Sequence, residues 1–317
     1  MRNIYSNIFK VNNKNLSKAV IYLKKKQLIG IPTETVYGIA GNAYSKEAVK
    51  KIYLLKKRPL KNPLIVHYLS LKQLESDVVL NDDFYKLYKK FCPGPITFVL
   101  KKKKKSLLPG IATANLKTVA VRIPRNRTIR KILKLLDFPL AVPSANKSTQ
   151  VSSVSARDVV NEFGASLKFI LDGGSCTIGL ESTVVDLTSK AKILRPGLIN
   201  PLEVSKILKK KVNIYKNSKI VKAPGMLKRH YSPGIPMKLN QKKAKINEAF
   251  IVYGKKYKKG KNIFNLSNKS NLNEAARNLY KILRLIKNKN YKIICVASIP
   301  QTGIGLAIND RLNRAAK

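Results

Sequence analysis

The sequence predicts an α/β protein with a twisted mixed sheet flanked by helices, followed by a small second α/β unit. Three observations support this fold class. Short apolar runs alternate with segments of helical period through residues 28–209. A polar, basic stretch with scattered prolines then interrupts the alternation at residues 210–248, which we interpret as a linker. A strand–helix–strand–helix pattern fills residues 249–317, a size near the lower limit for an independent core.

The elements follow from this apolar periodicity. Strands of the first unit are expected at residues 28–32, 64–67, 96–100, 119–123, 140–142, 169–171, 183–187 and 192–194. Helices are expected at residues 45–56, 82–91, 128–136, 155–163 and 201–209. Ser45 is a suitable N-cap for the first helix, and Pro93-Gly94-Pro95 stops the second. In the second unit we expect strands at residues 250–253 and 293–297 and helices at residues 272–286 and 306–316.

The charge of the chain is strongly positive. Lys and Arg number 64 against 16 Asp and Glu, which gives a formal charge of +48. A basic surface suits a nucleic-acid partner, because cations neutralise phosphates. The alternative is compositional, since Lys, Asn, Ile and Tyr are frequent and their codons are rich in A and T. We therefore assign function only to basic residues that lie inside motifs.

Several classes of protein are not expected. No apolar run is long enough to span a membrane, and the first thirty residues lack the pattern of a secretory signal. The three cysteines are far apart, which fits the reducing cytoplasm better than a disulfide framework. Phosphate-loop and dinucleotide motifs are absent, and two histidines with few acids leave little material for a metal cluster or a paired-carboxylate hydrolase.

Polar loops after the predicted strands are the remaining candidates for a site. Pro-Thr-Glu-Thr-Val-Tyr-Gly at residues 32–38 could line a pocket at a sheet edge, or form a strand-to-helix turn with Glu34 in solvent. Lys56 and Arg58 could clamp a polyphosphate, or could be cations favoured by a helix C-terminus. His67 ends an apolar strand, so a core histidine with satisfied hydrogen bonds is its alternative interpretation.

Two further groups follow later strands. Pro-Ser-Ala-Asn at residues 143–146, with Ser152 downstream, offers hydroxyl, amide and backbone N–H groups to phosphate oxygens, although Ser and Asn also populate ordinary turns. Arg122 and Arg195 lie in or beside apolar runs. Because an unpaired buried charge is costly, each should face a carboxylate or an anionic ligand.

In their order and spacing these segments resemble the threonylcarbamoyl-AMP synthase family in its longer two-domain form. The resemblance rests on the segments at residues 32–38, 56–67, 93–95, 143–146, 181–186 and 195–197. It extends to Pro-Gly-Met at 224–226, His-Tyr-Ser-Pro at 230–233, Gly-Ile-Gly at 303–305 and Asp-Arg-Leu at 310–312. The chain departs from the family pattern at Lys57 and Thr149, where glycine is usual.

The resemblance implies a YrdC-like catalytic domain at residues 1–209, a linker at 210–248 that closes over the active site, and a small Rossmann-like domain at 249–317. It implies condensation of L-threonine, bicarbonate and ATP to threonylcarbamoyl-AMP and pyrophosphate, with magnesium expected to accompany ATP. The product would serve a threonylcarbamoyl transferase complex that modifies tRNA in the cytoplasm, with room for a transient tRNA contact. No residue is assigned as a metal ligand.

The resemblance also implies roles for individual residues. The basic and polar quartet around the nucleotide corresponds to Lys56, Arg58, Ser144 and Asn146. Other ATP contacts correspond to Asn62, Thr118, Ser152, Arg195 and Tyr231, with Tyr231 in a lid over the nucleotide. The positions that hold threonine correspond to Thr35, His67, Arg122, Val142 and Ser182. Two rival functions are an RNA-binding module without catalysis and carbamoyl transfer in cofactor maturation, which would require zinc-binding and acylphosphatase-like segments that the sequence lacks.

Overall fold

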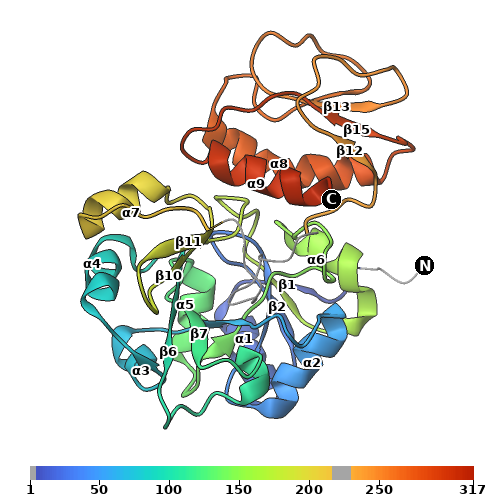
Figure 1. Ribbon diagram of the computed structural model, residues 1–317. Helices are drawn as coiled ribbons and strands as arrows, with labels where there is room; N and C mark the ends of the chain where they lie inside the picture. Colours follow the sequence, from blue (N-terminus) through green and yellow to red (C-terminus); the bar gives the residue numbers. More distant parts are fainter. Residues whose placement is uncertain (1–4, 216–229) are drawn as a thin grey trace.

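The computed structural model describes residues 5–215 and 230–317, which form two sheets with helices packed against them (Figure 1). The predicted Pro-Gly-Met segment at 224–226 lies outside these residues. The predicted α/β class with a mixed sheet is confirmed. Within the described residues, no helix has the length and apolar character needed to cross a membrane.

The larger sheet combines parallel and antiparallel pairs. Among the described residues its strand order is β1-β9-β2-β3-β8-β4-β7-β6-β10-β11, with β5 paired to β6. Its strands are β1 (Ile8–Lys10), β2 (Ile29–Ile31), β3 (Gly38–Asn42), β4 (Ile65–His67), β5 (Val78–Val79), β6 (Ile96–Lys102), β7 (Thr118–Arg122), β8 (Leu140–Ala141), β9 (Ile170–Asp172), β10 (Thr183–Asp186) and β11 (Lys192–Arg195). Most of these strands are buried on both faces, because helices or loops cover both sides of the sheet.

Helices cover this sheet and begin at side-chain caps. They are α1 (Asn13–Lys24), α2 (Lys46–Lys56), α3 (Leu71–Glu75), α4 (Asp82–Phe91), α5 (Arg127–Lys134), α6 (Ala156–Phe163) and α7 (Pro201–Leu208), with short 3-10 turns at Gly110–Thr113 and Gly164–Ser166. Ser45 caps α2 as predicted, by accepting a hydrogen bond from the Ala48 N–H. Ser155 begins α6 with a reciprocal capping box.

Several elements were not predicted from the sequence, and α1 is the longest of them. Its buried residues are Leu16, Ala19, Val20 and Leu23, a helical spacing that the surrounding Asn and Lys obscured. β3 was missed because its sequence, Gly-Ile-Ala-Gly-Asn, contains residues that disfavour strands. α3 and the short strands β1 and β5 were missed as well.

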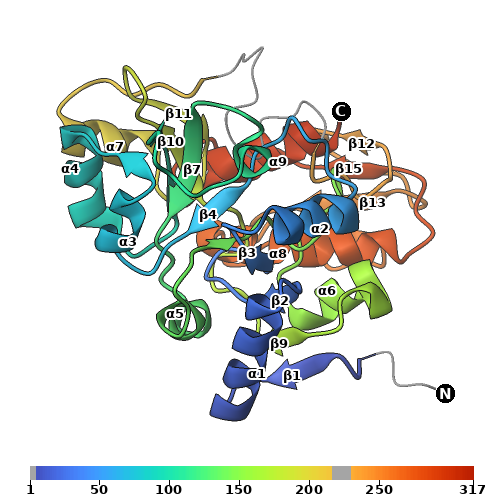
Figure 2. The ribbon, with the colours of Figure 1, turned by 90° about the horizontal axis from the view of Figure 1, so that it is seen from below.

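The smaller sheet is fully parallel and has the order β12-β15-β13-β14. It contains β12 (Met237–Lys238), β13 (Ala249–Val252), β14 (Ile263–Asn265) and β15 (Ile294–Val296), and it is accompanied by α8 (Leu272–Lys287) and α9 (Gly305–Ala315). β12 lies within the stretch interpreted as a linker, and β14 was not predicted. In Figure 1, α8 and α9 lie between this sheet and the larger unit. Figure 1 and Figure 2 both show α8 next to α6.

The contact between the two units is close at Gly179. A Cβ at this position would lie 2.6 Å from Arg277 Cα and 3.0 Å from the Ala276 carbonyl oxygen, both in α8. The φ of Gly179 is also positive, at +79°. The segment before β10 is therefore held directly against the backbone of α8.

Candidate functional site

A pocket lies where loops from several strands of the larger sheet meet residues 230–231. β4 and β7 are parallel neighbours, and their last residues, His67 and Arg122, are paired in the register. The β2–β3 loop and the loop after β8 adjoin them, and an isolated bridge joins Gly38 to Ser144. The pocket has a volume of about 40 Å³. The predicted residues that line it are Thr35, Arg58, His67, Arg122, Val142, Ser144, Ser182, Arg195 and Tyr231.

Arg122 and Glu34 form a buried ion pair at one wall of the pocket. Arg122 Nη2 lies 2.7 Å from Glu34 Oε1, and Arg122 Nη1 donates to Thr35 Oγ1 at 2.9 Å. Burial alone would raise the pKa of Glu34, but Arg122 and the Arg125 N–H outweigh it and lower this pKa to about 2. The alternative of a solvated Glu34 in a strand-to-helix turn is wrong, because its segment joins antiparallel β2 and β3 and Glu34 is only 6% exposed.

His67 does not fit the interpretation of a satisfied core histidine. It is buried and lines the pocket, and neither ring nitrogen has a well-aligned hydrogen-bond partner among the described residues. Burial, together with the charge of Arg122, lowers the pKa of His67 to about 3. The ring is therefore neutral at physiological pH, and its polar atoms are available to a ligand.

Another part of the site contains the basic and polar quartet, of which Arg58 and Ser144 line the pocket. Lys56 Nζ donates to the Ser144 carbonyl oxygen at 2.6 Å and also to the Asn146 carbonyl oxygen. Arg58 binds Asn62 twice, through Nε to the carbonyl oxygen at 2.9 Å and through Nη2 to Oδ1 at 2.7 Å. Burial, and then the neighbouring Arg58, lowers the pKa of Lys56 well below its usual value. Arg58 lines the pocket, whereas Lys56 braces the loop that presents Ser144.

Two short hydrogen bonds lie beside this quartet, and one of them involves Glu181. Ser144 Oγ donates to Asn146 Oδ1 at 2.5 Å, and Ser152 Oγ donates to Glu181 Oε1 at 2.6 Å. Glu181 lines the pocket and is buried. Burial alone would raise the pKa of Glu181, but Arg311 and Arg195 outweigh it and lower this pKa to about 2.

Residues of β10 and β11 complete the pocket. Arg195 is buried and donates from Nε to the Ser182 carbonyl oxygen and from Nη2 to Ser182 Oγ, both at 3.1 Å. Thr97 and Ser182 share a hydrogen bond of 2.7 Å between their hydroxyl groups. Gly197 packs tightly here, since a Cβ would lie 2.4 Å from the Thr183 nitrogen. The Arg-Pro-Gly turn is thus fixed beside Ser182.

The predicted residues do not all line the pocket. Asn62, Asn146 and Ser152 adjoin it through the hydrogen bonds described above. Thr118 begins β7, is paired with Lys101, and is not among the lining residues. The lining residues Thr33, Glu181 and His230 were not predicted from the sequence to have a role. Glu181 lies in the motif at residues 181–186 of a chain with many cations and few acids, and this was the signal that could have identified it.

The described residues contain no group of three or more His, Cys, Asp or Glu side chains suited to a metal ion. Glu181 is the carboxylate that lines the pocket, and its oxygens already accept hydrogen bonds from Ser152, Tyr280 and Arg311. Cys176 and Cys295 are buried, Cys92 is partly buried, and all three are free thiols. The side chains of the pocket therefore do not fit a resident metal ion.

Both departures from the family pattern stand at positive φ. Lys57 has a φ of 49° and Thr149 a φ of 72°. Thr149 also presents its carbonyl oxygen to the Ser232 N–H at 2.8 Å, so its backbone helps to hold the segment around Tyr231. A β-branched residue is strained in this region, which explains why glycine suits the position.

We expect Thr149→Gly to raise the free energy of unfolding by about 1 kcal/mol, because glycine adopts a positive φ without strain. The greater entropy of glycine in the unfolded chain offsets only part of this gain. Urea unfolding of the wild type and the variant measures the difference. Thr149→Ala is the matched control, since it keeps a Cβ and should gain less than the glycine variant. A glycine variant less stable than the alanine variant would contradict this account.

Acid should destabilise the protein in a defined pH window. The pKa of Glu34 and that of Glu181 fall from 4.5 to about 2 on folding, so each carboxylate stabilises the fold fully above pH 4.5. This stabilisation is lost as the pH falls from 4.5 towards 2, by on the order of 3 kcal/mol per residue. Urea unfolding at pH 7 and pH 3 measures the part of this loss that falls above pH 3, on the order of 2 kcal/mol per residue. Glu34→Gln should flatten the dependence, and an unchanged slope in that variant would contradict the assignment.

Buried cations and hydroxyl groups at strand ends of a mixed sheet define an α/β enzyme that acts on small anionic substrates. A family model described as "Telomere recombination" matches residues 21–197. A second, described as "Threonylcarbamoyl-AMP synthase, C-terminal domain", matches residues 197–317. The chain belongs to the threonylcarbamoyl-AMP synthase family.

Individual relatives agree with this membership over most of their length. A Pyrococcus abyssi protein named threonylcarbamoyl-AMP synthase is 35% identical, over 93% of this chain and 92% of its own. A Bacillus subtilis protein of the same name is 33% identical, over 96% of this chain and 94% of its own. The crystal structure of P. abyssi Sua5 complexed with L-threonine superposes with a TM-score of 0.90 at 32% identity, covering 98% of this chain and 97% of that one.

Proposed function

We propose that this chain is an L-threonylcarbamoyladenylate synthase, a nucleotidyltransferase that condenses L-threonine, bicarbonate and ATP. In the first step, the threonine amine combines with bicarbonate to give a carbamate and water. A carbamate oxygen then attacks the α-phosphorus of ATP, and pyrophosphate leaves as threonylcarbamoyl-AMP forms. This chemistry needs charge neutralisation and positioning more than acid–base catalysis, which agrees with a pocket rich in buried arginines.

We assign the two sides of the pocket to the two substrates. Arg58 and Arg195 would offset the triphosphate charge, and Ser144 would contact phosphate oxygens. Lys56 is the third basic residue of this group, and it braces the loop behind Ser144. Tyr231, Asn62, Asn146, Ser152 and Thr118 are the further proposed ATP residues.

The threonine side of the pocket would be formed by the ends of β4 and β7. Arg122 would bind the amino-acid carboxylate, while neutral His67 and the hydroxyl groups of Thr35 and Ser182 would bind its polar groups. Val142 would close this end. A guanidinium and uncharged hydrogen-bonding groups are the chemistry that a zwitterionic substrate with a hydroxyl side chain requires.

The remaining aspects of the function are part of the same proposal. Magnesium would arrive on the triphosphate, whose oxygens it prefers, since the pocket side chains do not suit a resident ion. The enzyme would act in the cytoplasm and supply a threonylcarbamoyl transferase complex for tRNA modification, and its basic surface would favour brief encounters with tRNA. We place the domain boundaries at residues 1–209, 210–248 and 249–317.

That Arg122, His67 and Ser182 line one pocket together with Arg58 and Arg195 is the observation that carries the proposal. Its test is pyrophosphate release from ATP in the presence of bicarbonate and single amino acids. We expect release that depends on both L-threonine and bicarbonate, and much less with L-alanine, which lacks the hydroxyl group. RNA binding without such turnover would instead support the non-catalytic alternative.

Residues 230–231 form part of the wall of the pocket. The enclosed space of about 40 Å³ is too small for a nucleotide, and Tyr231 is 1% exposed at its wall. Its backbone is held at a positive φ of 65°, which is strained for a bulky residue. We infer that this wall swings aside for ATP and then covers it, as a lid would.

We expect Tyr231→Ala to raise the Kd for ATP by about tenfold and to speed the loss of threonylcarbamoyl-AMP, because an aromatic cover is removed from the nucleotide. Nucleotide titration and the ratio of adenylate retained to AMP formed measure the two effects. Tyr215→Ala is the control, since Tyr215 is exposed and lies outside the pocket. Unchanged affinity and unchanged product loss would together exclude a lid at Tyr231.

A further inference from the structure

Arg311 belongs to the second unit but is buried against the pocket of the first. It lies on α9 and is 0% exposed. Its Nε lies 3.0 Å from Glu181 Oε2, and its Nη1 donates to the Pro196 carbonyl oxygen at 2.8 Å. Its guanidinium carbon is 5.2 Å from the centre of the Tyr231 ring. One side chain therefore touches three separate segments that bear pocket residues.

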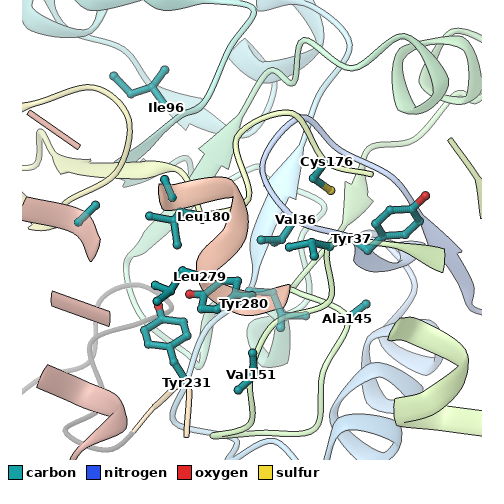
Figure 3. Packing of buried hydrophobic residues seen from close by; sticks show 14 of the residues in the cluster. Val36, Tyr37, Ile96, Ala145, Val151, Cys176, Leu180, Tyr231, Leu279 and Tyr280 are labelled. Atoms are coloured by element: carbon teal, nitrogen blue, oxygen red, sulfur yellow. The ribbon is translucent and has the colours of Figure 1, made fainter. Parts of the chain in front are cut away.

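These three segments carry the proposed nucleotide contacts. Glu181 accepts a hydrogen bond from Ser152, Pro196 follows Arg195, and Tyr231 forms the wall described above. Tyr280 of α8 supports the same group, because its hydroxyl donates to Glu181 Oε2 at 2.9 Å and its ring stacks on Tyr231 with centroids 5.9 Å apart. Figure 3 shows Tyr231 and Tyr280 next to each other, with Leu180 nearby.

Arg311 also compensates the negative charge of Glu181. Glu181 is a carboxylate in the wall of a pocket proposed to take a triphosphate, and without a cation it would repel that ligand. Arg311 forms a buried ion pair with Glu181, and solvent ions screen the interaction of buried charges only weakly. A second carboxylate, Asp310, accepts from Arg311 Nη1 at 2.8 Å and orients the guanidinium from the other side.

The alternative is that Arg311 only holds the two units together. Other groups already perform that task without touching lining residues. Arg284 of α8 donates from Nη2 to the Val151 carbonyl oxygen at 2.5 Å and to Ser153 Oγ at 3.2 Å. Gly179 lets the α8 backbone approach directly. Arg311 differs because each of its contacts outside α9 leads to a pocket segment.

We propose that Arg311 is a positioning residue for ATP, through which the second unit shapes and neutralises the nucleotide side of the pocket. The inference rests on the proposed function, since it names the ligand of that site. The C-terminal unit thereby takes part in nucleotide binding, although within the described part of the chain this unit contributes no residue that lines the pocket.

The test compares variants of the full-length protein in threonine- and bicarbonate-dependent pyrophosphate release. Arg311→Met should raise the KM for ATP by about tenfold or more, with kcat at saturating ATP changed much less, because it leaves the Glu181 charge uncompensated. Adding Glu181→Gln to Arg311→Met removes that charge and should recover part of the lost affinity. Arg311→Lys should fall between the wild type and Arg311→Met, since it keeps the charge without the fork.

Lys287→Met is the control for the interface. It removes a cation of α8 that donates to Gln150 Oε1 at 3.0 Å across the same two units, so it should leave the KM for ATP near that of the wild type. Equal KM increases in the Lys287 and Arg311 variants would overturn the proposal, as would an unchanged KM in a folded Arg311→Met. If Arg311→Met does not fold, Arg311→Lys and the double variant decide by the same KM comparison. A wild type without threonine-dependent turnover would instead contradict the proposed function itself.

Discussion

Replacing Arg58 by alanine is expected to abolish threonine- and bicarbonate-dependent pyrophosphate release, lowering kcat/KM for ATP by at least about 1000-fold. Arg58 lines the pocket, and burial lowers its pKa to about 10, so it remains charged at neutral pH. Its planar fork is already oriented by Asn62 and Pro63, which accept hydrogen bonds of 2.7 to 2.9 Å from it. Such a preorganised cation stabilises the charge that moves onto the leaving pyrophosphate.

Two further variants separate the role of Arg58 from loss of charge in general. Lys61→Ala removes the same formal charge from the same loop, but Lys61 is exposed and should be dispensable. Arg58→Lys keeps the charge without the two-pronged geometry and should restore only a small part of the activity. Circular dichroism and thermal unfolding check that Arg58→Ala is folded. Near-wild-type turnover in the folded variant would remove Arg58 from the site.

The sequence predicted which strands carry the site better than it predicted which charged residues pair with each other there. The strands that carry His67, Arg122 and Arg195 are apolar runs ended by polar residues, and that signal is local. The partner of each cation is not local, because Glu34 reaches Arg122 from 88 positions away and Arg311 reaches Glu181 from 130 positions away. Such pairs depend on how β2, β7, β10 and α9 are placed in space, which periodicity does not specify.

The net charge was a poor guide for the same reason. A formal charge of +48 is distributed over the surface, whereas the pocket depends on a few buried cations and on the acids that orient them. Glu34 and Glu181 belong to a set of only 16 acids, and both are used to fix arginines beside the pocket. In a chain with so few acids, a buried acid is more informative than any single lysine.

Arg122→Ala should have the second large effect, on stability as well as on activity. Removing the cation leaves Glu34 buried without its partner, which we expect to lower the free energy of unfolding by about 3–5 kcal/mol. It also removes the group proposed to bind the threonine carboxylate, so pyrophosphate release should no longer saturate with threonine. Urea unfolding and threonine titration measure the two effects. Arg125→Ala is the control, because its exposed side chain is lost while its backbone N–H still binds Glu34.

A double variant separates the structural role of Arg122 from its proposed role in binding. Arg122→Met with Glu34→Gln removes both charges at similar volume, and replacing a buried ion pair in this way often restores stability. We therefore expect the double variant to regain most of the lost free energy of unfolding but none of the threonine saturation. Recovery of a wild-type KM for threonine would mean that Arg122 serves only to compensate Glu34. Stability as low as that of the single variant would mean that the polar contacts of Arg122 with Thr35 and Gly94 matter more than its charge.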